Sequence, residues 1–390
     1  MNARLLFVLL ASLISACSPD TETTPNAITG LRLDSILGQQ DSEAYTKADQ
    51  ARVFTFPADH GPHNSYRSEW WYLTAALHDR DGNEYGLHFT LFRQALAPQT
   101  TGDGPWHTAQ AYLGHLAITD VSRRRHLEAE RFARGHPQLA GVTTGEQFHA
   151  LIEDWSLAGS ADGNLQLALV AEEAGKFSVE LQIRQTGPVV LQGDRGLSHK
   201  GTGNASYYYS IPRLQITGQL KVGDRSIDVS GPGWLDREWS TSVLGESVEG
   251  WDWFSLQLQD QRSIMAFRLR RQDGKRDVYD HGLLVNHPQL SNQPVVGAGD
   301  AGVKLLNHND FSLTPTRFYQ DSRGIQWPVS WLLQLGDETF AINALLDQQT
   351  MELSILYWEG LVEVLDSVGN RKGLGYMELT GYGQESSDRR

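Results

Sequence analysis

From about residue 53 onward, apolar and polar residues alternate along short stretches, which is the pattern of half-buried β-strands. The clearest case is 85–93, where one face of an extended chain carries Tyr85, Leu87, Phe89 and Leu91. A dense aromatic run over 69–77 and a polar turn precede it. Further strands are predicted over 109–118, 148–157, 165–171, 177–184, 207–210, 214–222 and 225–229. Long helical patterns are scarce, so the chain is predicted to be an antiparallel sandwich or barrel.

The second half of the chain repeats the order of the first half. Residues 250–258 resemble 69–77, because both segments place a carboxylate beside tryptophans and continue into an alternating strand. Each is followed by a polar turn and a strand that ends in arginine, Arg93 or Arg270. Later strands are predicted over 331–335, 338–346, 351–358, 361–365 and 375–380. We predict an all-β protein with two related β-domains in tandem, joined near 240–249. The alternative is that aromatic-rich strands recur by chance.

The N-terminus has the pattern of a lipoprotein signal. Arg4 precedes an apolar stretch over 5–14, and Ser15-Ala16-Cys17 follows with the only cysteine of the chain. The apolar stretch is too short to cross a bilayer of about 30 Å, so we predict a cleaved signal peptide over 1–16. Lipidation of Cys17 would then anchor the protein to a membrane. The alternative is an ordinary secretory signal followed by an unmodified cysteine.

After the signal peptide, the chain is predicted to consist of a tether and two domains. Residues 17–50 are polar and are read as a lipidated tether, followed by an N-terminal domain over 51–245 and a C-terminal domain over 246–385. Ser18, rather than aspartate, follows the cysteine, which favours the periplasmic face of the outer membrane. No second thiol is available for a disulfide, so stability must come from the core.

Charge and histidine spacing exclude several classes of function. The formal net charge is −14, which argues against nucleic acid as a partner. The basic run over 123–125 lies among acidic residues and is interpreted as a solvated turn. The histidines show no metal-binding spacing, and no phosphate-binding loop or Gly-x-Ser-x-Gly nucleophile motif is present. We therefore expect no metal and no cofactor.

The strongest candidate for chemistry is the segment 231–239, in which a Pro-Gly turn is expected to lead into a short strand. Alternation places Trp234, Asp236 and Glu238 on one face, and Leu235, Arg237 and Trp239 on the other. A carboxyl group packed against indole rings loses hydration, which raises its pKa and suits it to be a general acid. Indole faces also stabilise a developing cation. The alternative is a salt bridge between Asp236 and Arg237 or a more distant arginine.

Glu69 and Trp70 form a second candidate site, with Glu69 directed into a barrel mouth. The alternative is that Glu69 forms a buried pair with Arg93.

Two further pairs of aromatic residues are candidates for ligand contact. Tyr207 and Tyr209 share one face of a strand and are predicted to line an apolar pocket with their hydroxyls as donors. The alternative is that both belong to the core. Trp251 and Trp253, on either side of Asp252, are expected to meet the segment that ends at Trp239 across the domain junction.

Five motifs, in this order, resemble those of a known family. They are 63–74, 204–213, 233–239, 250–254 and 357–360. They resemble the secreted, lipocalin-like proteins of the carotenoid hydratase (hydroxyneurosporene synthase) superfamily, and its AttH-type branch in particular. The resemblance covers about residues 50–385. It implies two packed lipocalin-like β-barrel domains with an apolar cavity near their junction.

The resemblance implies different functions in its different branches. In the hydratases an aspartic acid protonates an isoprenoid double bond; Asp236 matches that acid and Trp234 the neighbouring aromatic position. Tyr207 and Tyr209 stand where the hydratases place a histidine and a tryptophan. The AttH-type branch is associated with ABC transport systems. Its members are often called secreted hydrolases, but this sequence contains no nucleophile motif that would support hydrolysis.

Three functions follow as expectations. The first is a periplasmic, membrane-anchored protein that binds an apolar lipid or isoprenoid and exchanges it with an ABC transporter permease. The second is a hydratase or isomerase with Asp236 as its acid. The third is a structural partner without a ligand.

Overall fold

A computed structural model describes residues 42–99, 102, 104, 107–145, 147–242, 248–290 and 293–383. The predicted signal peptide, Cys17 and most of the tether lie outside these residues. The described helices are three short 3₁₀ turns, η1 (Ser42–Ala44), η2 (Ala58–His60) and η3 (His287–Gln289). Among the described residues, no helix is long and apolar enough to cross a membrane.

Fourteen described strands form the first sheet, which curls into a nearly closed barrel. Its main path is β4-β3-β2-β1-β13-β12-β9-β8-β7-β6-β5. The strands are β1 (Ser68–His78), β2 (Glu84–Ala95), β3 (Gln110–Asp120), β4 (Arg125–Arg134), β5 (Ala140–Thr143), β6 (Phe148–Ile152), β7 (Trp155–Ser160), β8 (Gln166–Glu173), β9 (Phe177–Gln185), β10 (Val189–Leu191), β11 (Leu197–Gly201), β12 (Asn204–Val222), β13 (Arg225–Ser242) and β17 (Val295–Val296).

Ten described strands form the second sheet, a half-barrel whose main path is β18-β16-β15-β14-β24-β23-β21-β20-β19. They are β14 (Val248–Leu258), β15 (Arg262–Arg271), β16 (His281–Asn286), β18 (Val303–Asn307), β19 (Phe311–Gln320), β20 (Gln326–Leu335), β21 (Glu338–Ala344), β22 (Thr350–Glu352), β23 (Leu356–Leu365) and β24 (Arg371–Thr380). The all-β prediction with two lipocalin-like domains is confirmed. Every strand up to Ser242 belongs to the first sheet and every strand from Val248 onward to the second, except β17, which pairs with β10 of the first sheet. The domain bounds given above stay predictions.

Several predicted segments differ from the structure: 207–210 and 214–222 belong to one strand, β12, and the predicted strand 351–358 is divided between β22 and β23. The Pro-Gly turn expected at 231–233 is wrong, because β13 runs through it without a break and Gly231 pairs with Ile216 of β12. Glycine is required at 231 because a Cβ there would lie 2.1 Å from the carbonyl oxygen of Ala76 on β1. The segment 148–157 is a tight hairpin of β6 and β7 rather than one strand, with Glu153 at a positive φ of 53° in its turn.

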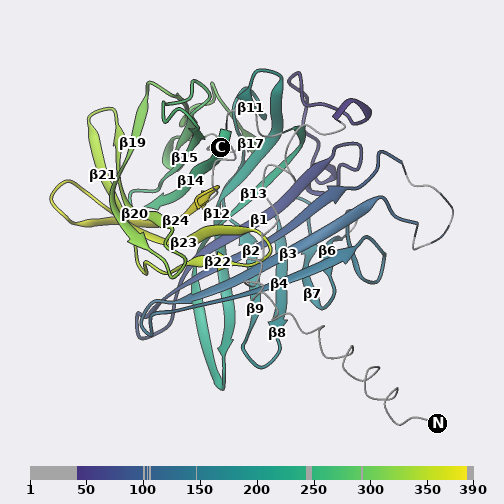
Figure 1. Cartoon of the computed structure of the whole chain (residues 1–390), viewed down its shortest axis with the longest axis horizontal. Helices are drawn as coiled ribbons and strands as arrows, with labels where there is room; N and C mark the ends of the chain where they lie inside the picture. Colours follow the sequence, from purple (N-terminus) through teal and green to yellow (C-terminus); the bar gives the residue numbers. More distant parts are fainter. Residues whose placement is uncertain are drawn as a thin grey trace, which may run out of the picture. The chain divides into compact units, whose positions relative to one another are not determined.

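The buried side chains form a core inside each sheet, a third cluster between the sheets, and a smaller fourth cluster that joins Leu113 of β3 to Tyr357 of β23. Trp71, Leu73 and Trp239 lie in the first core, and Trp331 and Trp358 in the second. The third cluster joins both sheets and includes Tyr72, Trp234, Trp253, Phe267, Leu361 and Tyr376. Strands β23 and β24 lie beside β2 and β1, so the outer face of the first barrel packs on the second sheet (Figure 1). We call this contact the sheet interface.

Candidate functional site

Strand β13 brings three predicted site residues to the sheet interface. Its neighbours in the first sheet are β1 and β12, and the antiparallel register places Tyr72 opposite Asp236 and Trp70 opposite Glu238. Trp234 belongs to the interface cluster, whereas Leu235 and Trp239 belong to the barrel core. The predicted division of this segment into two faces is therefore confirmed.

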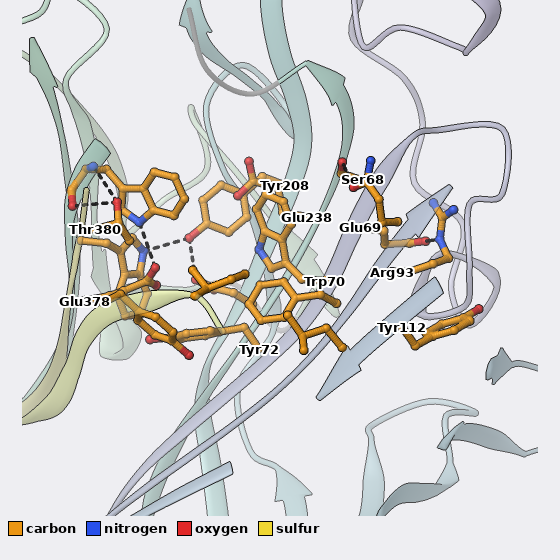
Figure 2. Close-up of a pocket in the computed structure, with 18 of the residues that line it drawn as sticks. Ser68, Glu69, Trp70, Tyr72, Arg93, Tyr112, Tyr208, Glu238, Glu378 and Thr380 are labelled. Atoms are coloured by element: carbon orange, nitrogen blue, oxygen red, sulfur yellow. Dashed lines mark hydrogen bonds and ion pairs between the residues drawn. The ribbon is translucent and has the colours of Figure 1, made fainter. Parts of the chain in front are cut away.

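A cavity of about 250 Å³ lies at this interface. Its lining is mainly apolar and aromatic, with a few carboxyl groups and one lysine among the rings. Figure 2 shows part of this lining, including Trp70, Tyr72 and Glu378. Side chains of both sheets contribute, including Trp70, Tyr72, Tyr208, Asp236 and Glu238 from the first and Trp251, Trp253, Phe267, Tyr357 and Glu378 from the second. Such a cavity suits an apolar small molecule that meets a few polar groups.

Asp236 is the central carboxyl group of this cavity, and only 3% of the residue is exposed. Its Oδ1 accepts hydrogen bonds from Trp234 Nε1 (2.6 Å) and Ser210 Oγ (2.5 Å), and its Oδ2 accepts one from Tyr208 Oη (2.5 Å). Burial raises the pKa of Asp236 to about 7, although these three donors oppose the shift and the charge of Glu238 adds to it. Near neutral pH the group can therefore both hold and release a proton.

Tyr208 connects Asp236 to the second sheet. Its hydroxyl lies 2.5 Å from Asp236 Oδ2 and accepts a hydrogen bond from Trp253 Nε1 at 3.2 Å. Burial raises the pKa of Tyr208 well above its ordinary value, so the phenol keeps its proton. When Asp236 is protonated, it can donate to the Tyr208 oxygen, and the hydroxyl hydrogen of Tyr208 is then free to point elsewhere.

Glu238 has a different environment, because a buried cation compensates it. Lys200 Nζ forms an ion pair with Glu238 Oε1, and the Ser206 hydroxyl donates to the same oxygen. The ammonium lies 5.1 Å from the ring centroid of Phe267 and at slightly greater distances from the rings of Trp70 and Tyr208. This arrangement favours a paired charge rather than a proton donor.

Two further glutamates face each other across β23 and β24. Glu359 and Glu378 are direct cross-strand partners; Glu359 is fully buried and Glu378 is half-buried. Burial raises the pKa of Glu378 to about 8 and that of Glu359 well above its ordinary value. Trp251 Nε1 donates to Glu378 (3.1 Å), and Tyr72 Oη donates to Glu359 (2.7 Å). Figure 2 shows Glu378 and Tyr208 on the same side of the cavity.

The comparison with protein families decides the assignment, because the AttH-like family model matches residues 47–382. The chain belongs to the AttH-like family. The crystal structure of an AttH candidate from Nitrosomonas europaea is 30% identical, covers 86% of this chain and 99% of its own, and has a TM-score of 0.74. No curated protein is a match.

Two solved structures with lower identity share the fold of this AttH-like chain. Kievitone hydratase from Nectria haematococca is 14% identical, covers 86% of this chain and 95% of its own, and has a TM-score of 0.61. CghA is also 14% identical, with coverages of 89% and 98% and a TM-score of 0.52. The predicted AttH-type family and the predicted lipocalin-like β fold are therefore confirmed.

Tyr207, Tyr209 and Trp239 do not line the cavity of this AttH-like chain. They face the barrel core, where Tyr209 Oη lies 2.6 Å from His60 Nδ1 and Tyr207 and Tyr209 both pack against Trp239. The expectation of a pocket lined by the two tyrosines is corrected: Tyr208 faces the cavity. The reason is register, because Tyr208 pairs with Glu238 while Tyr207 pairs with Trp239.

Trp251 and Trp253 line the cavity but do not meet Trp239, because their strand packs on the outside of the first barrel. Trp253 packs against Trp234 instead, with ring centroids 6.3 Å apart, and Trp251 donates a hydrogen bond to Glu378. The expected meeting with the segment that ends at Trp239 is therefore seen, and the contact is made by Trp234.

Glu69 is part of a buried ionic network at the edge of the cavity. It accepts from Arg237 Nη2 (2.7 Å), Arg93 Nε (3.0 Å) and the backbone N–H of His63 (2.9 Å). Burial alone would raise the pKa of Glu69, but the two arginines and His63 outweigh burial and hold it at about 2. The predicted Glu69–Arg93 pair is thus present. A salt bridge between Asp236 and Arg237 is not, because Arg237 is directed to Glu69.

Sequence reasoning missed four groups that shape the site. Tyr208 had a local signal, since alternation groups it with Ser206 and Ser210, whose hydroxyls also bond the β13 carboxylates. Glu359 lies within the motif 357–360 but was not singled out. Lys200 and Glu378 had no signal, because each reaches the site through a different strand. Among the described residues, no group of three or more histidine, cysteine, aspartate or glutamate side chains is placed to hold a metal ion.

Proposed function

We propose that this AttH-like protein is an acid–base enzyme that adds water to a double bond of an apolar small molecule. The observation that carries the proposal is the environment of Asp236. It is a buried carboxyl group with a pKa near 7, bonded only to neutral donors, at the wall of an aromatic cavity. A general acid at neutral pH requires these properties.

The reaction begins with proton transfer to the alkene. Protonated Asp236 donates its Oδ2 proton to Tyr208 Oη, and Tyr208 passes its own hydroxyl proton to one alkene carbon, whose π electrons form the new C–H bond. The neighbouring carbon becomes a cation, and the faces of Trp70, Tyr72 and Trp253 stabilise it. A water oxygen then bonds to that carbon, and the water loses one proton. The shared fold with kievitone hydratase supports this class of reaction.

A non-catalytic carrier is the second candidate, and the mainly apolar lining of the cavity favours it. A carrier uses the same cavity but does not need the proton of Asp236. The two proposed functions therefore differ in whether they need the acidic proton of Asp236. Asp236→Asn separates them, because asparagine keeps the shape of the side chain and removes the acid.

The experiment uses the protein purified from its own membrane. Native mass spectrometry with lipid extraction first tests for a bound compound, and N-phenyl-1-naphthylamine tests whether the cavity takes up an apolar probe. The protein is then incubated with a total lipid extract of the source cells in H₂¹⁸O, and ¹⁸O-labelled products are measured. Asp228→Asn is the control, because Asp228 is an exposed carboxylate on the same strand.

We expect wild type and Asp228→Asn to form a labelled product, and Asp236→Asn to bind the probe but label about 100- to 10,000-fold more slowly. Equal labelling by Asp236→Asn would refute the acid role. Probe uptake without labelling by any variant would establish the carrier, and failure of wild type to take up any probe would leave the structural role.

We also propose that Cys17 is lipidated and holds the mature protein at the periplasmic face of the outer membrane, where an ABC transporter permease is its partner. The polar tether and the signal pattern support this location. Mass spectrometry of the N-terminal peptide should show an acylated Cys17, and Cys17→Ser should release the protein from the membrane fraction. An unmodified Cys17 in the mature protein would refute the anchor.

A further inference from the structure

The second sheet contributes a tyrosine to the cavity that the proposed acid does not use. Tyr357 of β23 lines the cavity and is 4% exposed. Its hydroxyl lies 2.7 Å from Nδ1 of His115 on β3, and the two rings are nearly parallel, at 21°. His115 Nε2 lies 3.1 Å from Oε2 of Glu130 on β4. A carboxylate, an imidazole and a phenol are therefore bonded in sequence.

The hydrogen bonds between Glu130, His115 and Tyr357 determine where the protons of these three groups lie. A carboxylate only accepts, so Glu130 selects the His115 tautomer with hydrogen on Nε2. Nδ1 then carries a lone pair and accepts the hydroxyl proton of Tyr357. Burial lowers the pKa of His115 and Glu130 partly opposes this, so the ring is neutral near pH 7. The same logic activates the nucleophile or base of a catalytic triad.

Glu130 links the buried pair to solvent. Its side chain is 24% exposed, whereas that of His115 is fully buried. The Ser354 hydroxyl and the Ser354 backbone N–H both donate to Oε2 of Glu130, which keeps the carboxylate in place and favours its ionised form. A proton that reaches His115 can therefore leave through Glu130.

His88 provides an independent observation on the same wall. It lines the cavity, is 1% exposed, and has a ring centroid 6.1 Å from that of Tyr357 in an edge-to-face arrangement. Its Nε2 is bonded to Thr90 Oγ1 at 2.6 Å. Within the described part of the chain, its Nδ1 is buried without a hydrogen-bond partner. Buried ring nitrogens are normally bonded, so a small polar molecule is expected to occupy this position.

We propose that Tyr357 is a second catalytic group, which binds the attacking water together with His88 and takes up its proton, and that His115 and Glu130 are its positioning residues. This inference rests on the proposed function, because it supplies the base for the hydration step.

The step balances in atoms and charge. As the water oxygen bonds to the carbocation, one water proton moves to Tyr357 Oη, and the original hydroxyl proton of Tyr357 moves to His115 Nδ1. The imidazolium so formed is stabilised by the carboxylate of Glu130 and later loses one proton to solvent. Asp236, which supplied the first proton, regains one from solvent. The net change is one water added to one double bond.

The experiment compares Tyr357→Phe and Glu130→Gln with wild type. Tyr382→Phe is the matched control, because the Tyr382 hydroxyl also donates to a buried side chain, in its case Asp252 Oδ1 at 2.8 Å, but Tyr382 does not line the cavity. N-phenyl-1-naphthylamine reports binding, and ¹⁸O labelling of the total lipid extract reports turnover. We expect Tyr357→Phe to bind the probe as wild type does and to label about 100- to 1,000-fold more slowly.

Nitrogen-15 NMR of histidine-labelled protein gives a readout that is independent of turnover. We expect His115 to carry hydrogen on Nε2 and to accept at Nδ1, with the Nδ1 signal moving in Tyr357→Phe and the tautomer ratio changing in Glu130→Gln. A wild-type His115 protonated on Nδ1 would overturn the inference even if the enzyme is active.

The remaining outcomes separate the two proposals. Equal labelling by wild type and Tyr357→Phe overturns the role of Tyr357 and leaves the proposed function intact. No labelling by wild type overturns the proposed function and the catalytic role of Tyr357 together. A fall in labelling that Tyr382→Phe shares to the same extent would assign the effect to lost stability and so also overturn the role.

Discussion

Replacing Asp236 with asparagine should change how the stability of the protein depends on pH. The two side chains have nearly the same shape, but asparagine has no proton to lose in this range. In the folded protein, burial raises the pKa of Asp236 from an ordinary value of 3.8 to about 7. In the unfolded chain the carboxyl group returns to its ordinary value. The folded state therefore binds this proton more tightly than the unfolded state does.

The sign and the size of this pH dependence follow from the difference in proton binding between the folded and unfolded states. Below about pH 4, Asp236 is protonated in both the folded and the unfolded state, so it does not change how the free energy of unfolding depends on pH. Between about pH 4 and pH 7 the folded state keeps the proton while the unfolded state loses it, so stability falls by about 1.4 kcal/mol per pH unit. Over about 3 units the loss is about 4 kcal/mol. Asp236→Asn removes this loss, although its amide fits the hydrogen bond of Tyr208 less well, at a cost of about 1 kcal/mol.

Urea unfolding followed by tryptophan fluorescence, from pH 4 to pH 8, measures this effect. We expect Asp236→Asn to be about 1 kcal/mol less stable than wild type at pH 4 and about 3 kcal/mol more stable at pH 8. Asp228→Asn, which removes an exposed carboxylate from the same strand, should follow the wild-type curve. Parallel curves for wild type and Asp236→Asn would show that the pKa of Asp236 is not raised, and the argument for a general acid would fail.

Two further substitutions test the barrel end and the sheet interface. Glu69→Gln leaves Arg93 and Arg237 buried without their carboxylate and should lower the free energy of unfolding by about 3–5 kcal/mol in urea titrations near pH 7. Since the pKa of Glu69 is held at about 2, this difference should persist above pH 4.5 and disappear only as the pH falls towards 2, and a difference that vanishes by pH 4 would contradict the network. Gly86→Ala places a Cβ 2.5 Å from Tyr376 Oη of the second sheet and should cost about 1–3 kcal/mol by the same method, whereas Gly141→Ala, which meets no atom within 4 Å, should not. Equal stability of the two alanine variants would show that the sheets do not pack closely at Gly86.

Strand periodicity was sufficient to predict part of the site. Within 231–239, alternation separated the cavity face from the core face, because each residue of an extended strand points opposite to its neighbour. The same rule paired Tyr207 with Tyr209 correctly but could not tell which face of β12 meets the other sheet. That choice depends on the register with β13, which pairs Tyr208 with Glu238, and register is a property of two strands rather than one.

The rest of the site depends on how the two sheets pack. Glu378, Tyr357 and His115 lie on β24, β23 and β3, and no local pattern indicates that the outside of the first barrel receives the second sheet. His115 is a single histidine within an alternating strand, so its sequence position carries no sign of a bond to Tyr357, which is 242 residues away. Such pairs become visible only when both strands have been placed.

Glu69 and Asp236 are buried in opposite environments, and the contrast distinguishes a structural carboxylate from a reactive one. Glu69 is surrounded by Arg93, Arg237 and His63, so its charge is compensated and its pKa is held at about 2. Asp236 is equally buried, yet its bonded partners are a phenol, a hydroxyl and an indole, none of which carries charge, and its pKa is raised to about 7. A carboxyl group that served only stability would be expected to have a cation beside it, because an uncompensated buried charge is costly. Lys200 is close enough to compensate Glu238 on the same face of β13 and leaves Asp236 without a cation. This selective pairing is what an acid needs if it is to exchange its proton near neutral pH.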